Sequence, residues 1–211
     1  MFGSILNFFG CKGQAGKDEA ASGRDSVNKQ ILSSFEDFKN RPVHRVLTME
    51  ILDSVSDDNL EQTIIDNLYA KLEAGISYEK HYQIIKNLSA GRQAVFATWA
   101  LEGEVNNGGF NQYFYNFTSS GQYAEEARDG FRLIGADKLA DLTQGAIDMV
   151  MKNAKHLSKF RDGTLESFSK SYDDNPLNDL DDAFYELGKT ENISQLRIKY
   201  IKAHKGEFID K

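Results

Sequence analysis

The chain has few cysteines, which stabilise small secreted domains through disulfides, and few prolines, which interrupt helices. It contains one cysteine, Cys11, and two prolines, Pro42 and Pro176, in 211 residues. A single cysteine excludes a disulfide within the chain and a metal site made of four thiolates. Few prolines, together with β-branched residues that occur singly rather than in alternating runs, favour helices over strands. The sequence therefore predicts an all-α fold in a reduced, cytoplasmic setting.

Long apolar runs and clusters of basic residues are also missing. No apolar run approaches the roughly 20 residues that a membrane-spanning helix needs, so no transmembrane segment is predicted. Asp and Glu number 32 against 25 Lys and Arg, which gives a formal net charge of -7. Proteins that bind nucleic acid directly depend on clustered Lys and Arg. We therefore expect no direct nucleic-acid binding.

The sequence lacks the signatures of common enzymes and metal proteins as well. It has no P-loop, no dinucleotide-binding glycine motif and no G-x-S-x-G elbow. The histidines are far apart, and none has a partner at metal-motif spacing; they are His44, His81, His156 and His204. We therefore expect a protein that is not an enzyme, with no catalytic residues, no metal and no cofactor.

The first 41 residues differ in composition from the rest. Residues 1–10 are apolar, and residues 12–25 are small, polar and rich in glycine, as in a flexible linker. We expect residues 1–41 to be a partly disordered leader and linker, and residues 42–211 to form a single compact α-helical domain. Three alternatives stay open for the leader: a short amphipathic helix that packs on the domain or on a partner, tethering to a membrane surface through its phenylalanines, or a lipid anchor on Cys11.

Apolar residues recur at spacings of three and four through most of the domain, which predicts a succession of helices. The expected helices cover residues 60–72, 78–88, 89–109, 110–117, 123–134, 138–154, 177–187 and 193–204. Asp57, Asp58 and Asn59 offer N-cap oxygens for the first of these helices, and Gly75 is expected to end it. Gly135 is expected to end one later helix and Asp137 to cap the next.

The densest group of polar side chains lies in Leu101–Asn116, LEGEVNNGGFNQYFYN. Its Asn-Asn-Gly-Gly run predicts a chain reversal between two helices, where glycine supplies a positive φ. The amides and tyrosines around it either line a hydrogen-bonding surface or satisfy helix ends while the rings fill the core. The motif residues that we expect to be structural or binding are Glu104, Asn106, Asn107, Gly108, Gly109, Gln112, Tyr113 and Asn116.

Two glutamates precede this run. Glu102 and Glu104 are two residues apart, so on a helix they point in different directions and do not form a carboxylate pair. We expect Glu104 to accept hydrogen bonds from the amides that begin the next helix, or from tyrosine hydroxyls, rather than to act in catalysis. The alternative is a small-molecule-binding or hydrolytic pocket around Glu104, Asn107, Gln112 and Tyr113.

Three stretches of the sequence are specific enough to indicate a family. They are EVNNGGFNQYFYN at 104–116, FRLIGA at 131–136, and LDDAFY at 180–185 followed by Tyr200, Ile201 and Phe208. Over about residues 60–211 the chain resembles the DNA mimic protein 19 family, bacterial proteins most of which are described only as domains of unknown function. The resemblance implies a helical domain that can dimerise. It also implies an acidic surface that imitates duplex DNA and occupies the DNA-binding face of a transcription factor.

The acidic residues are concentrated in two blocks. Residues 50–74 hold seven acids and one base, and residues 160–191 hold nine acids and three bases, so each block has a net charge of -6. If the blocks adjoin in the fold, they form a stripe that attracts a basic partner; if they lie apart, they are ordinary solvated surface. The tail 192–211 has a net charge of +3, which would weaken an imitation of DNA.

The function that follows from these observations is a non-enzymatic interaction module with a protein partner, such as a DNA-binding protein. The acids that we expect to contact this partner are Asp173, Asp174, Asp179, Asp181, Asp182, Glu186, Asp53, Asp57, Asp58 and Glu61.

Overall fold

The structure is a computed structural model that describes residues 29, 31–72, 76–117, 122–173 and 175–210, without the side chains of residues 78, 117 and 122. The apolar leader, Cys11, the glycine-rich linker, Gly75 and Asp174 lie outside the described residues. The chain divides into two compact units between Pro42 and Val43. In the first unit, residues 31–40 form a helix, and the guanidinium of Arg41 lies 3.6 Å from the centre of the Phe38 ring.

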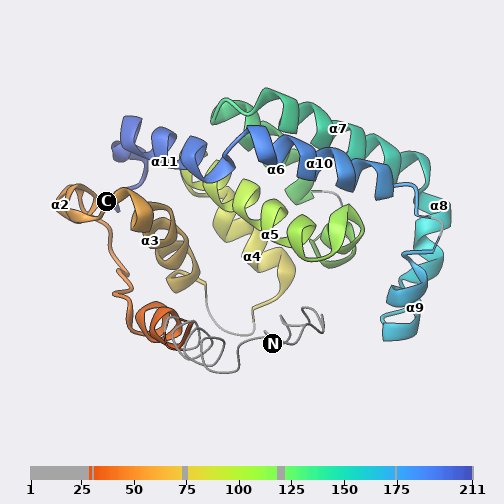
Figure 1. Ribbon diagram of the computed structural model, residues 1–211, viewed down its shortest axis with the longest axis horizontal. Coiled ribbons are helices and arrows are strands. Elements are labelled where there is room, and N and C mark those ends of the chain that lie inside the picture. Colours follow the sequence, from red (N-terminus) through yellow and green to blue (C-terminus); the bar gives the residue numbers. More distant parts are fainter. Residues whose placement is uncertain (1–28, 30, 73–75, 118–121, 174, 211) are drawn as a thin grey trace, which may run out of the picture. The chain divides into compact units, whose positions relative to one another are not determined.

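The second unit is built from helices (Figure 1). They are α2 (Met49–Ser54), α3 (Asp57–Ala70), α4 (Tyr78–Lys86), α5 (Ala90–Phe117), α6 (Gln122–Leu133), α7 (Asp137–Lys152), α8 (Ala154–Leu157), η1 (Ser158–Phe160), α9 (Leu165–Lys170), α10 (Asn178–Thr190), α11 (Ile193–Ala203) and η2 (Lys205–Glu207). Every regular element in the described part of the chain is helical, so the predicted all-α class is confirmed. None of the helices described is long and apolar enough to span a bilayer.

Two of the predicted helix caps are wrong. Helix α3 begins at Asp57, with Ser56 at the N-cap position, so Asp57 and Asp58 lie in its first turn instead of capping it. Helix α7 likewise begins at Asp137, with Ala136 at the cap position. In both cases a carboxylate in the first turn favours the helix through the positive end of its dipole, which gives a sequence signal similar to that of a cap.

The periodicity missed several short helices, and two of these, α2 and α9, begin with a threonine cap. Thr48 Oγ1 accepts a hydrogen bond from the Ile51 backbone N–H at the start of α2, and Thr164 caps α9 in the same way through Ser167. Each of these helices has six residues, too few to show an apolar stripe over two turns.

The connection between α6 and α7 is the predicted glycine turn. Gly135 has φ of 85°, and the N–H of Ala136 donates to the carbonyl of Phe131 at 2.7 Å, while the N–H of Gly135 donates to Arg132. This pair of bonds is a Schellman motif, which closes the last turn of a helix around a left-handed residue.

Helix α5 contributes to both hydrophobic clusters of the second unit. Its first half, with Val95 and Phe96, packs with α3, α4 and α11 around Ile64 and Ile201. Its later part packs with α6, α7 and α10 around Phe110, and in that cluster the rings of Phe110 and Phe184 meet edge to face at 5.9 Å. The two clusters meet along α5, so a change in the shape of this helix alters the packing of both.

The C-terminal segment is bound to α5 and α3 by a buried arginine. Arg92 is 3% exposed; it donates to Asn67 Oδ1 at 2.9 Å and to the carbonyl of Phe208, and its guanidinium lies 3.0 Å from an Asp210 carboxylate oxygen. Asp210 also pairs with Lys71 at 2.9 Å. These contacts place the end of the basic tail beside the first acidic block.

Candidate functional site

The Asn-Asn-Gly-Gly run forms a two-residue break inside α5. Gly108 has φ and ψ of -161° and 29°, and Gly109 has 72° and 179°, so neither residue is helical. The sequence predicted a chain reversal between two helices here. The structure has the boundary between the helices, but as a kink of two residues rather than a reversal. Gly109 is the residue with the left-handed φ, a conformation that other residues rarely adopt.

Three side chains from residues 172–185 bridge this break. The carboxylate of Asp181 accepts a hydrogen bond from the Phe110 backbone N–H at 2.7 Å. The Tyr172 hydroxyl donates to the Gly108 carbonyl at 3.0 Å, and the Tyr185 hydroxyl donates to the Val105 carbonyl at 2.8 Å. Backbone groups that a break leaves without helical partners are therefore satisfied from α10 and the segment before it.

Asp181 lies so close to the break that glycine is required at position 109. A Cβ atom added to Gly109 would lie 2.2 Å from Asp181 Oδ2. Burial raises the pKa of the Asp181 carboxyl above its ordinary value; the hydrogen bond from Phe110 acts in the opposite sense, and the charge of Asp182 adds to the rise. Asp181 is thus a half-buried helix cap supplied by another helix.

Glu104 connects the two halves of α5 across the Gly108–Gly109 break. Its Oε2 accepts from the side-chain amides of Gln112 and Asn116, each at 2.8 Å. The expectation that Glu104 accepts hydrogen bonds from amides therefore needs a correction. The amides belong to side chains, because the backbone N–H that begins the second half of α5 is already occupied by Asp181.

The amides and the aromatic rings of the motif separate by exposure. Asn106, Asn107 and Asn116 are exposed, whereas Tyr113 and Phe110 are fully buried in the core. The three asparagines therefore lie on the surface, and the rings of Tyr113 and Phe110 lie inside. The amide of Asn111 is buried as well, and it donates to the Ser171 hydroxyl at 2.7 Å.

A cavity beside the motif is too small for a metabolite. It is lined on α5 by Asn111, Phe114 and Tyr115 and has a volume of about 10 Å³, room for roughly one water molecule. Glu104, Asn107, Gln112 and Tyr113 do not line it. The alternative prediction of a small-molecule or hydrolytic pocket gains no support from this cavity.

Helix α10 carries a row of exposed carboxylates. Asp179, Asp182 and Glu186 recur at helical spacings of three and four residues, so they share one face of the helix. Glu186 pairs with Lys189 on the same helix at 2.5 Å. Asp179, Asp182 and the exposed Asp173 before the helix have no Lys or Arg partner among the described residues.

Two exposed acids of the first block differ from the α10 row, because lysines of the C-terminal region face them. Asp57 pairs with Lys202 at 2.8 Å, and Asp53 pairs with Lys205. Asp58, next to Asp57, is exposed. Lys202 and Lys205 of the basic tail thus form ion pairs with α3 and α2 of the same molecule.

Glu61, another acid of the first block, belongs to a buried charge cluster. Arg197 on α11 is 1% exposed, and its guanidinium lies 2.8 Å from Glu61 and also contacts Glu102 on α5. The Ser194 hydroxyl donates to Glu61 as well. Glu102 therefore points away from Glu104, as their spacing predicted, and both Glu61 and Glu102 serve the packing of α3, α5 and α11.

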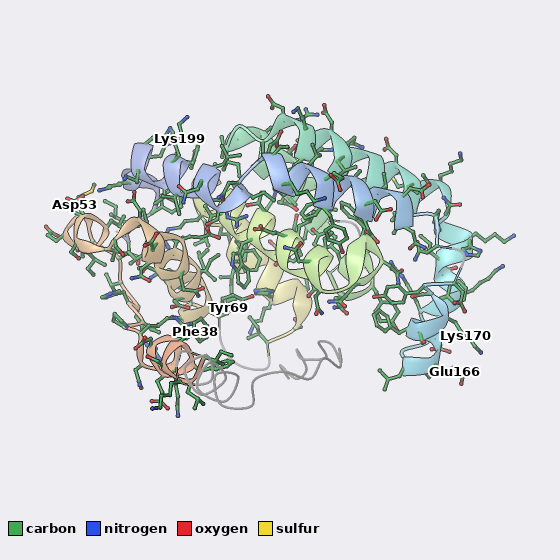
Figure 2. The ribbon with its side chains drawn as sticks, in the orientation of Figure 1. Phe38, Asp53, Tyr69, Glu166, Lys170 and Lys199 are labelled. Carbon is green, nitrogen blue, oxygen red and sulfur yellow. The ribbon has the colours of Figure 1, made fainter. Side chains whose placement is uncertain are left out.

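The two acidic blocks lie on different sets of helices. Helices α2 and α3 contact η2, α5 and α11, whereas α10 contacts α5 and α7. Figure 2 shows Asp53 at one end of the second unit and the Glu166–Lys170 pair of α9 at the other. The acids of the two blocks that Figure 2 labels, Asp53 and Glu166, thus lie at opposite ends of the unit.

Several residues that define this region were not expected from the sequence. Tyr172, Tyr185 and Arg197 were not singled out, and Asp181 was expected to contact a partner rather than to cap a helix. The LDDAFY stretch was a usable signal for two of them, since it places an aspartate and a tyrosine at i and i+4 on one helix face. Among the described residues, no group of three or more His, Cys, Asp or Glu side chains is arranged to hold a metal ion.

The sequence matches a family of known proteins. The family model described as DMP19-like protein matches residues 86–204, from the end of α4 to just beyond α11. The match is narrower than the expected 60–211, but it contains the break in α5, the three side chains that bridge it (Tyr172, Asp181 and Tyr185) and the whole second acidic block. No curated protein and no solved structure matches the sequence significantly. Because the matched residues make up more than half of the chain, the protein belongs to the DMP19-like protein family.

Proposed function

We propose that this protein is a non-enzymatic interaction module that binds a basic partner protein through the exposed carboxylates of α10 and the residues just before it. The observation that carries the proposal is the contrast in pairing between the two acidic blocks. Asp53 and Asp57 on α2 and α3 pair with lysines of the C-terminal region, although Asp58 has no such pair among the described residues. Asp173, Asp179 and Asp182 all face solvent without a cation in the described part of the chain.

The spacing of the α10 carboxylates is suited to a partner that binds a linear series of negative charges. With a rise of about 1.5 Å per residue, Asp179, Asp182 and Glu186 present one carboxylate per roughly 5 Å of helix axis. A DNA strand presents one phosphate per about 3.4 Å of its axis. The row therefore offers a sparser version of one phosphate strand, and the partner we propose is a DNA-binding protein whose basic face it occupies.

The exposed amides of α5 lie next to this row and add hydrogen-bonding groups to it. Tyr185 on α10 is bonded to the carbonyl of Val105, which precedes Asn106 and Asn107. Amides have both donors and acceptors, so they can adjust to a polar partner. The interaction surface thus consists of the α10 carboxylates and the two asparagines before the break.

A comparison of two matched triple variants tests the proposal. One variant carries Asp179→Asn, Asp182→Asn and Glu186→Gln on α10; the other carries Asp53→Asn, Asp57→Asn and Asp58→Asn on α2 and α3. Partners are captured from an extract of the source organism, and a DNA-binding protein retained by the native chain is purified. Displacement of labelled duplex DNA from that protein is then measured.

We expect the native chain and the α2–α3 variant to displace the DNA, and the α10 variant to fail. Electrostatic attraction to the partner should also weaken as salt rises, because exposed charges are screened. Equal displacement by the α10 variant, or retention of no DNA-binding protein by the native chain, would refute the proposed function.

A further inference from the structure

An exposed tyrosine ring stands within the proposed surface. Tyr185 is 40% exposed, and its hydroxyl is bonded to the Val105 carbonyl at 2.8 Å, so the tip of the ring is anchored to α5. The ring also meets Phe184 edge to face at 6.3 Å. A ring held at its tip and at one edge keeps a constant orientation, with part of its surface open to solvent.

An exposed carboxylate lies one helical turn from this ring. Asp182 precedes Tyr185 by three residues on α10, so the two side chains are neighbours on one face. The negative charge of Asp182 contributes to the raised pKa of Tyr185, after burial and together with Asp181, which agrees with this closeness. Asn106, which is exposed, is the residue that follows Val105, whose carbonyl accepts the hydrogen bond from the Tyr185 hydroxyl.

Carboxylate, ring face and amide oxygen together match a guanidinium better than an ammonium. A guanidinium is planar, stacks on aromatic rings and directs several N–H donors in a fixed fork toward a carboxylate. An ammonium is a compact, strongly hydrated charge. It is attracted to the carboxylate, but it does not stack on the ring and lacks the planar fork of N–H donors that reaches carboxylate and amide together. Charge alone, as on the rest of α10, does not distinguish the two.

We propose that Asp182, Tyr185 and Asn106 form a recognition site for an arginine side chain of the partner, so that the surface selects arginine-rich over lysine-rich segments. This inference rests on the proposed function, because it names the chemistry that the same surface recognises. The guanidinium lies over the Tyr185 ring, pairs with Asp182 and donates to the Asn106 side-chain oxygen.

The test compares two fluorescein-labelled peptides of equal length and charge, octa-arginine and octa-lysine. Their affinities for the full chain are measured by fluorescence anisotropy in one buffer. We expect the native chain to bind octa-arginine about two to five times more tightly than octa-lysine, the range that an exposed cation–π contact supplies. Tyr185→Leu should bring the ratio to about one, and the control Tyr69→Leu, at an exposed tyrosine of α3, should leave it unchanged.

Two further variants keep the test decisive if Tyr185→Leu fails to fold. Tyr185→Phe retains the ring but loses the anchoring hydrogen bond, and it should reduce the arginine preference only in part. Asp182→Asn should weaken octa-arginine binding more than octa-lysine binding, whereas Asp148→Asn, at an exposed aspartate of α7, should not change the ratio.

The outcomes separate this inference from the proposed function. Equal binding of both peptides by the native chain, or an arginine preference that survives both Tyr185→Leu and Asp182→Asn, overturns the arginine site and leaves the basic-partner proposal standing. Failure of both peptides to bind overturns the arginine site and also counts against the proposed function.

Discussion

The acidic blocks at residues 50–74 and 160–191 have the same net charge, yet the fold uses them in opposite ways. In the first block, Asp53 and Asp57 pair with lysines of the tail, and Glu61 is drawn into a buried cluster with Arg197. In the second block, Asp181 turns inward to cap a helix while Asp179 and Asp182 stay exposed. Net charge along a sequence therefore says little about surface charge until the positions of the opposite charges are known.

The two acidic blocks also connect different helices of the fold. The first block connects α2 and α3 to α11 and η2 across the N-terminal half of α5. The second block connects α10 to the break in α5.

The largest effect is expected at Arg197, the buried arginine that faces Glu61 of the first block. Arg197→Met removes the cation that faces Glu61 and Glu102 and leaves two carboxylates close together with little access to water. Breaking a buried pair by removing one partner costs about 3–5 kcal/mol. Urea denaturation should show a loss of this size in the free energy of unfolding. A loss below about 1 kcal/mol would mean that the cluster relaxes into solvent.

The next effect is expected at the glycine of the break. Gly109→Ala places a Cβ against the Asp181 carboxylate in a backbone with φ of 72°, so it combines strain with loss of the cap. We expect a cost of about 2–3 kcal/mol from these two causes.

Gly103→Ala is the matched control, since a Cβ at this exposed helical position meets nothing within 4 Å. It should stabilise the protein by roughly 0.5–1 kcal/mol, because alanine loses less entropy than glycine in a helix. If both variants lose stability equally in thermal unfolding, the special role of position 109 is wrong.

These two sites illustrate what the sequence can and cannot predict. The glycine break, the Gly135 turn and most of the helices were predicted because periodicity and glycine chemistry act between residues a few positions apart. The contact of Asp181 with Phe110 spans 71 residues, and that of Arg197 with Glu61 spans 136. No local pattern identifies such partners, so a carboxylate that caps a distant helix looks the same in the sequence as one that faces solvent.

The surface was predictable only in part for the same reason. The sequence showed the motif residues as a group, but which of them face solvent depends on how α10 crosses α5. The pairing of the tail with α2 and α3 depends on the return of α11 to the N-terminal helices. The sequence showed a basic tail that would weaken an acidic stripe, whereas the fold places that tail against the first block.

A smaller effect is expected for the cap itself. Asp181→Ala removes the acceptor for the Phe110 N–H and should cost about 1 kcal/mol. Asp181→Asn keeps an acceptor oxygen and removes a charge that burial disfavours, so at neutral pH it should be at least as stable as the native chain. A loss in Asp181→Asn equal to that in Asp181→Ala would show that the charge, rather than the acceptor, holds the helix.

The pH dependence of this pair of variants has a definite sign. Because the pKa of Asp181 is raised in the folded protein, the folded state holds this proton more tightly than the unfolded state does. The stability from protonated Asp181 is therefore present at low pH and is lost as the pH rises above the ordinary value of 3.8. Over that rise, urea titrations should show the stability of Asp181→Asn increasing relative to the native chain.

The smallest effect on stability is expected at the exposed ion pairs of the first block. Removing these pairs tests directly whether lysines of the tail cause the difference between the two acidic blocks. Lys202→Met together with Lys205→Met removes the cations that face Asp57 and Asp53. Exposed pairs contribute about 0.2–1 kcal/mol each, so the protein should remain folded.

The first block would then present carboxylates without partners, as α10 does, and octa-lysine should bind more tightly at low salt. This gain should vanish at high ionic strength, because exposed charges are screened over a few ångströms there. Unchanged peptide affinity at low salt would show that the tail does not mask the first block, and the difference between the two blocks would then have to lie in their shape.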